Sequence, residues 1–323
     1  MRRELGPAPV ELGLVEPEKV LRAEQSFIND IPNAFAPGAI IKANPVKRGL
    51  LKIAAALLAV FLMVGAFAQR GRFQEPDDDE KLAPPRNAEF HFLRLEYTDL
   101  PQYHRRWGYT SRDGLGTGWW LVDWPAADNH FTYGIQRLTR IDIGDPRHLR
   151  LLDDKIFDYP WIYATQTGWW NLSDKEADRL REYLLRGGFL MTDDFWGPGG
   201  EQWEVFRQTM NRVFPDKEIT EIDESDSSMH VLYDIREKDR TFIPGSRHLR
   251  RMGDGSVQVI QPPGTNPQWH AINDDRGRMV VAVNYNTDIG DAWEFADVPY
   301  YPEQMTALAY RYGINYIIYA MSH

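Results

Sequence analysis

The sequence predicts an α/β fold in which a mostly parallel sheet carries helices on both faces. Three observations predict it: a strand–loop–helix–strand unit over residues 161–194, a continuous apolar strand at 279–284, and a long apolar-faced helix over about 302–321. A continuous apolar run is typical of a strand buried on both faces, as in parallel sheets. We therefore expect a single α/β domain over residues 89–323.

The predicted elements outside the central unit rest on simpler sequence patterns. Residues 90–97 are apolar and β-prone, which predicts a first strand. Asp128 is predicted to cap a helix, and a second helix is predicted over residues 202–213. The buried face of the helix after Asp128 is expected to comprise Phe131, Ile135 and Leu138.

The central unit has the strongest local signals. Residues 161–165 predict a short buried strand, and Ser173 with Glu176 predicts a capping box at the start of a helix. Gly187–Gly188 indicates the end of that helix, because glycine readily adopts the left-handed conformation found there. Residues 189–192 then predict the next strand.

Composition excludes several classes of function. The chain has 323 residues, 37 Lys+Arg against 47 Asp+Glu, and no cysteine. A net charge of −10 argues against general nucleic-acid binding, which needs a basic surface. The lack of cysteine excludes disulfides, thiolate zinc sites and a cysteine nucleophile. We predict no cofactor.

The segment 47–68 has the pattern of an export signal. A basic stretch, an apolar run and an Ala-x-Ala site follow one another there, as in a signal peptide cleaved before Gln69. The uncharged run 53–68 would span about 24 Å as a helix, short of a hydrocarbon core about 30 Å thick. An uncleaved anchor formed by residues 49–68 is the alternative. Either way we expect an exported domain, in the periplasm or on the extracytoplasmic face of the cytoplasmic membrane.

Two polar segments flank this signal. Residues 1–46 are rich in Pro, Ala and Glu, and we predict a disordered leader or a misplaced start. The alternatives for the true start are Met1 and Val46, since GTG codons also initiate bacterial translation. Residues 69–88 are polar and contain three prolines, which predicts a linker.

Acidic and aromatic side chains follow three of the predicted strands. The carboxylates are Asp193, Asp194, Asp288, Asp291 and Glu294, and the tryptophans are Trp169, Trp170, Trp196 and Trp293. Ligands of open α/β sheets bind at the carboxyl ends of strands, so we expect these groups to form one site. Asp193, Asp194 and Asp288 are the catalytic candidates, and the others are ligand-binding candidates. Such a set suits a sugar, or a hard cation.

Structural interpretations compete with each of these assignments. Strand-end acids often only cap turns, and one tryptophan of each adjacent pair is expected in the core. Asn286–Asp288 can form an Asx-turn. The histidines show no metal-binding spacing, so the sequence predicts no metal site. There is also no G-x-S-x-G motif for a serine nucleophile.

Several motifs resemble the bacterial family called domain of unknown function 4159. They include GWWLVDWPAAD at 118–128, LRGGFLMTDDFWG at 185–197 and NTDIGDAWE at 286–294, and the resemblance covers about residues 89–323. It implies a class I glutamine amidotransferase-like, flavodoxin-like fold that here lacks the amidotransferase cysteine. It transfers no catalytic residue. It also implies an association with MoxR-type ATPases and von Willebrand A-type proteins of the envelope.

These observations lead to two functional hypotheses. The first is an uncharacterised, non-catalytic binding or scaffold module of the bacterial cell envelope, exported or membrane-anchored, that engages an envelope protein or a glycan. The second is a hydrolase of envelope or polysaccharide sugars that uses Asp193 or Asp194 as general acid or base. A deep pocket around raised-pKa carboxyls favours the enzyme, whereas acids tied into backbone hydrogen bonds favour the scaffold.

Overall fold

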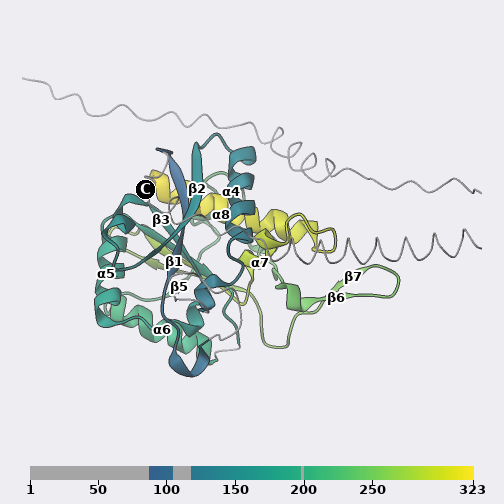
Figure 1. The fold of residues 1–323 in the computed structure, drawn as a ribbon, viewed down its shortest axis with the longest axis horizontal. Helices are drawn as coiled ribbons and strands as arrows, with labels where there is room; N and C mark the ends of the chain where they lie inside the picture. Colours follow the sequence, from purple (N-terminus) through teal and green to yellow (C-terminus); the bar gives the residue numbers. More distant parts are fainter. Residues whose placement is uncertain (1–86, 105–117, 198–199) are drawn as a thin grey trace, which may run out of the picture. The chain divides into compact units, whose positions relative to one another are not determined.

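A mixed seven-stranded sheet forms the centre of the computed structural model, which describes residues 87–104, 118–197 and 200–323 (Figure 1). Its strands, in spatial order, are β2 (Ile143–Arg150), β1 (Phe90–Glu96), β3 (Trp161–Thr165), β4 (Phe189–Asp193), β9 (Met279–Tyr285), β8 (Gln268–Asn273) and β5 (Thr220–Glu221). The first five run parallel, whereas β8 and β5 are antiparallel to their neighbours. The parallel part has the strand order 2-1-3-4-5, which doubly wound sheets use.

Helices cover both faces of this sheet, as the sequence predicts. On one face lie α5 (Asp174–Leu185) and α6 (Glu201–Val213). On the other lie α4 (Ala126–Leu138), α7 (Ile289–Glu294) and α8 (Glu303–Ser322) (Figure 1). The α/β class with a mostly parallel sheet is therefore confirmed.

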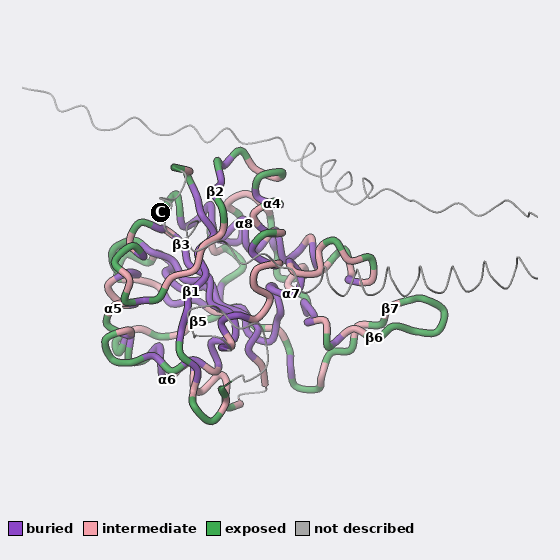
Figure 2. Tube along the Cα trace, in the orientation of Figure 1, coloured by how far each residue is buried: buried purple, intermediate pink, exposed green. Residues whose placement is uncertain are grey.

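The strands alternate between two cores. In β1, Phe92 packs toward α4 and α8, whereas Leu93 packs toward α5 and α6. Every residue of β9 is buried, which confirms a strand covered on both faces. Figure 2 shows this buried centre with exposed residues along the outer helices and loops. The alternation also places Arg94, Tyr163 and Asp193 on the α4 side of the sheet.

The predicted ends of α5 are confirmed. The Ser173 hydroxyl accepts a hydrogen bond from the Glu176 backbone amide at 3.3 Å, and a Glu176 carboxylate oxygen accepts the Ser173 amide at 2.7 Å. Gly187 follows the helix with φ +112°, a conformation that a side chain would strain.

Two parts of the sequence prediction need correction. Asp128 does not cap α4, because the N-cap is Pro125 and the Asp128 side chain is buried in an ion pair. The prediction also missed β2, β8 and β5, and the hairpin of β6 (Leu249–Arg251) with β7 (Val257–Val259). β2 and β5 are edge strands with exposed positions, so they lack the apolar alternation that marks a half-buried strand.

A buried ion pair holds α4 against β1. Arg94 and Asp128 are both fully buried, and the Arg94 Nε atom donates to both Asp128 carboxylate oxygens at 3.0 and 3.1 Å. The Arg94 Nη1 atom also donates to the carbonyl oxygens of Trp120, at 3.1 Å, and Val122, at 2.8 Å. The guanidinium therefore fixes the loop that precedes α4, which carries Asp123.

We expect Asp128→Ala to lower the free energy of unfolding by about 3–5 kcal/mol, because it leaves the Arg94 charge buried without a partner. Asp154→Ala is the matched control: its exposed pair with Arg179 should contribute no more than about 1 kcal/mol. Urea unfolding of both variants measures the difference, and similar losses in the two would contradict a special role for Arg94.

The parts of the chain predicted to lie before the domain are outside the described residues. They are the leader 1–46, the signal or anchor 47–68 and most of the linker 69–88. Within the described ranges, no helix is both long and apolar enough to cross a membrane.

Candidate functional site

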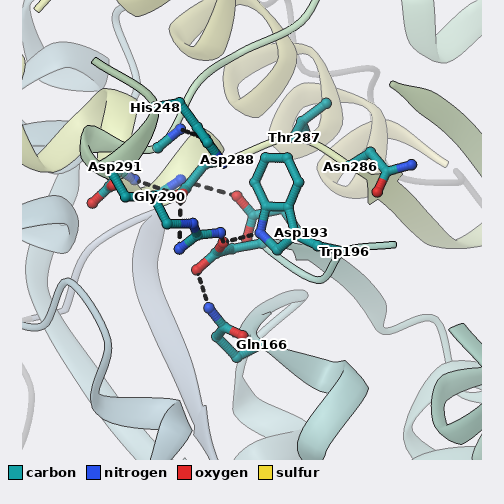
Figure 3. Close-up of polar contacts among 12 residues, drawn as sticks. Gln166, Asp193, Trp196, His248, Asn286, Thr287, Asp288, Gly290 and Asp291 are labelled. Carbon is teal, nitrogen blue, oxygen red and sulfur yellow. Dashed lines mark hydrogen bonds and ion pairs between the residues drawn. The ribbon is translucent and has the colours of Figure 1, made fainter. Parts of the chain in front are cut away.

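The carboxyl ends of β3, β4 and β9 bring the predicted acidic segments together (Figure 3). The Gln166 amide donates to the Asp193 carbonyl oxygen at 3.1 Å, and the Asp194 amide donates to the Thr287 carbonyl oxygen at 2.9 Å. These backbone bonds join the three strand ends. The segment 244–248 lies over them, with Ser246 and Arg247 bonded to the acids.

Asp193 is fully committed to hydrogen bonds. Its Oδ1 atom accepts the Tyr163 hydroxyl at 2.6 Å, and its Oδ2 atom accepts the backbone amides of Ile289 at 2.6 Å and Gly290 at 2.9 Å. The side chain is 0 % exposed. Asp193 therefore binds the first turn of α7 to the end of β4, and no oxygen faces solvent.

Asp194 is held by side chains instead. Its carboxylate accepts hydrogen bonds from the side-chain amide of Gln166, from the Trp196 indole, and from the Arg247 guanidinium at 3.1 Å. It is 1 % exposed, whereas the Arg247 side chain is 50 % exposed. Arg247 therefore covers Asp194 on the solvent side.

Asp288 and Asp291 lie beside this pair. Asp288 caps α7, and its Oδ1 atom accepts the Asp291 amide at 2.9 Å. Asp291 Oδ2 accepts the Ser246 amide at 2.5 Å. Asp123, from the loop before α4, brings a third carboxylate to them: the three offer ligand atoms within 4.8 Å of one another.

Sequence reasoning missed three members of the site. Asp123 lies in a turn and Arg247 in a short 3-10 helix, and both are distant in sequence from the ends of β3, β4 and β9. Tyr163 has the sequence pattern of an ordinary core residue of a strand. The GWWLVDWPAAD motif was the available signal for Asp123, because it places an acid in a loop otherwise rich in tryptophan.

Backbone strain concentrates at the same edge. Four non-glycine residues of the described chain have positive φ angles: Asp123, Gln166, Asp194 and Asn286. Three of them, Gln166, Asp194 and Asn286, directly follow the last residues of β3, β4 and β9. Strain of this kind costs about 1–3 kcal/mol per residue and tends to persist at functional sites.

The tryptophan candidates divide into core and surface. Trp170 and Trp293 are 1 % and 0 % exposed, so they present no face to a ligand and are removed from the candidate stacking surface. Trp293 stacks on Phe131 with ring centroids 4.0 Å apart. Glycine at 313 permits this packing, since a Cβ there would lie 2.4 Å from the Phe131 ring. Glu294 is partly buried at the end of α7.

Trp169 and Trp196 are half-buried, and each ring packs against other side chains of the protein. Trp169 lies against Tyr103, with centroids 4.4 Å apart, and stacks with Trp119 at 6.2 Å. The Arg247 guanidinium lies 4.9 Å from the Trp196 ring centroid. Neighbouring side chains therefore take up part of the ring surface on which a sugar would stack.

A family model matches residues 109–321, which is most of the chain. The chain belongs to this family, Domain of unknown function (DUF4159). No functionally curated protein matches it.

Burial governs the electrostatics of this DUF4159 site. It raises the pKa of Asp193 to about 7, the neighbouring Asp194 charge adds to this effect, and the three hydrogen bonds only partly oppose it. Burial also raises the pKa of Asp194, which the Arg247 charge counteracts. The pKa of Asp288 is raised well above its usual range by burial and by Asp194 and Asp291.

The pKa of Asp193 predicts a pH dependence of stability. Because the folded-state pKa lies above the unfolded value of 3.8, the protonated carboxyl stabilises the fold below about pH 4, and this stability is lost as pH rises through about 7. The loss amounts to roughly 4 kcal/mol for one such group. We expect Asp193→Asn to flatten the decline in unfolding free energy between pH 4 and pH 8.

Urea unfolding in EDTA-containing buffer measures this slope. Asp254→Asn, in the exposed turn between β6 and β7, is the control and should keep the wild-type slope. An unchanged slope in Asp193→Asn would show that the buried carboxyl titrates at its ordinary value.

Proposed function

We propose that this DUF4159 chain is a non-catalytic binding module of the bacterial cell envelope, exported or membrane-anchored and acting outside the cytoplasm. The observation that carries the proposal is that both acid/base candidates are already engaged. Asp193 accepts hydrogen bonds through both carboxylate oxygens, and Arg247 covers Asp194. A general acid or base must reach the proton that it transfers. Neither carboxylate presents a free oxygen to a substrate.

The fold supports the same proposal. The strand order 2-1-3-4-5 with helices on both faces supports a class I glutamine amidotransferase-like architecture. Enzymes of that architecture use a cysteine nucleophile, and this chain has none. The pattern of residues 47–68 supports export, as argued from the sequence.

A projecting hairpin supports protein binding over glycan binding. The hairpin arm (residues 249–260) carries β6 and β7, which pair only with each other, and extends away from the sheet (Figure 1). Met252 and Ile260 are each 43 % exposed on it, beside the exposed Arg250 and Arg251. We infer that these apolar side chains, on a hairpin that pairs with no other described strand, contribute to an interaction surface. The side chains packed against Trp169 and Trp196 argue against sugar stacking.

The partner that we propose is an envelope protein, with MoxR-type ATPases and von Willebrand A-type proteins as the first classes to test. We expect the double variant Met252→Asp, Ile260→Asp to lose at least about tenfold in affinity for such a partner, since it places two charges in an apolar contact. Leu185→Asp, at a 50 % exposed position of α5, is the matched control.

Biolayer interferometry with immobilised wild-type or variant protein compares the affinities for partner proteins purified from the same cell. Equal affinities for the hairpin-arm double variant and for wild type would contradict the proposed surface. Binding lost in the Leu185 control as well would indicate a general loss of structure.

A hydrolase of envelope sugars is the alternative, and the pKa of about 7 at Asp193 favours it, because this range suits a general acid. We expect the purified protein not to cleave chromogenic glycosides or envelope polysaccharide. Turnover that Asp193→Asn or Asp194→Asn abolishes, measured by product release, would overturn the non-catalytic proposal.

A further inference from the structure

Three aspartates from two segments of the chain, the loop before α4 and the start of α7, converge near the strand ends. Asp123 comes from the loop that Arg94 fixes, Asp288 from the residue that caps α7, and Asp291 from the first turn of that helix. One carboxylate oxygen of each lies within 4.8 Å of the others. This spacing suits one ion that touches all three, because carboxylates bind Ca²⁺ at about 2.3–2.6 Å and Mg²⁺ at about 2.0–2.1 Å.

Two carboxylate oxygens of these aspartates are buried and accept no hydrogen bond from the described residues. Asp288 is 1 % exposed, and its Oδ2 atom accepts no hydrogen bond, although its Oδ1 atom accepts the Asp291 amide. The Arg247 Nη1 atom lies 4.0 Å from that oxygen. The Oδ2 atom of Asp123 is likewise buried and accepts nothing. Buried carboxylate oxygens without a donor are costly, and they indicate a ligand.

Two glycines make room for these oxygens. A Cβ atom at Gly290 would lie 2.4 Å from Asp123 Oδ2, and one at Gly245 would lie 2.4 Å from Asp288 Oδ2 and 3.1 Å from Asp291 Oδ2. Any other residue at either position would therefore displace a carboxylate. The backbone on both sides of the cluster is shaped around the oxygens.

Negative charge predominates among the described residues around the cluster. The neighbouring Asp194 carboxylate raises the pKa of both Asp123 and Asp288. Of the two guanidinium groups near them, Arg94 is already paired with Asp128, and Arg247 is paired with Asp194. A divalent cation would compensate two of the remaining charges.

We propose that Asp123, Asp288 and Asp291 bind a hard divalent cation, Ca²⁺ or Mg²⁺. The donors are all carboxylate oxygens, which these two ions prefer. The Nδ1 atom of the neighbouring His248 accepts the Gly245 amide at 3.0 Å, so this nitrogen is engaged. The site does not depend on the proposed protein partner, since none of its residues lies in the hairpin arm.

A proton shared between carboxyl groups is the competing explanation for the cluster, and a direct binding measurement separates the two. Full-length protein stripped with EDTA is titrated with CaCl₂ and separately with MgCl₂ by isothermal calorimetry. We expect one ion per chain for at least one of them. The same ion should raise the thermal unfolding midpoint relative to EDTA, because a ligand that binds only the folded state stabilises it.

The variants Asp288→Asn and Asp291→Asn test the assignment. Each should lose about tenfold or more in cation affinity, and each should melt in EDTA at or above the wild-type temperature, because removing one charge relieves repulsion. A purely structural role of these side chains would instead lower the midpoint in EDTA. Asp254→Asn, in the hairpin arm, is the control and should bind as wild type does.

Arg247→Ala provides an independent readout. Removing a positive charge 4.0 Å from Asp288 Oδ2 should tighten cation binding. The proposal is overturned if neither ion binds at millimolar concentration, or if binding is undiminished in both asparagine variants. Weaker binding in Arg247→Ala than in wild type would also count against it.

Discussion

The constraint on which this structure depends is the burial of acidic side chains at one edge of the sheet. A carboxylate in a low-dielectric interior needs donors or a counter-charge. Each acid meets this need differently: Asp128 pairs with Arg94, Asp193 accepts two amides and a hydroxyl, and Asp194 accepts three side-chain donors. The loop before α4, the start of α7 and the segment 244–248 are all positioned by these bonds.

The sheet supplies the rigid part of this arrangement. Because side chains alternate along a strand, the parallel register of β1, β3 and β4 places Arg94, Tyr163 and Asp193 on the same face. Tyr163 then donates to Asp193, and the Arg94 guanidinium lies 5.0 Å from the Tyr163 ring centroid. The ion pair that holds α4 and the carboxylate that holds α7 therefore belong to one continuous packed layer.

Whether a feature of the structure could be predicted depends on how local its sequence pattern is. The capping box at Ser173 and the apolar run of β9 are local, and both were predicted. The edge strands β2 and β5 lack an apolar alternation and were missed. The strand-end rule brought Asp193 and Asp288 together. Asp123 and Arg247 reach the site through tertiary packing, which the strand-end rule does not cover. The sequence also could not tell which tryptophan of a pair faces the core, hence the error at Trp170.

Strain and charge coincide at this edge, and their coincidence argues for function rather than for stability. Asp123 and Asp194 combine a left-handed backbone with a buried carboxylate, so each bears two unfavourable contributions at once. A glycine at either position would relieve the backbone strain, and a neutral side chain would avoid the cost of burying a charge. Three donors converge on the Asp194 carboxylate, and their hydrogen bonds offset part of the cost of burying it. Asp123 Oδ2 accepts no such bond from the described residues. A shared proton, or the cation proposed above, would stabilise that oxygen.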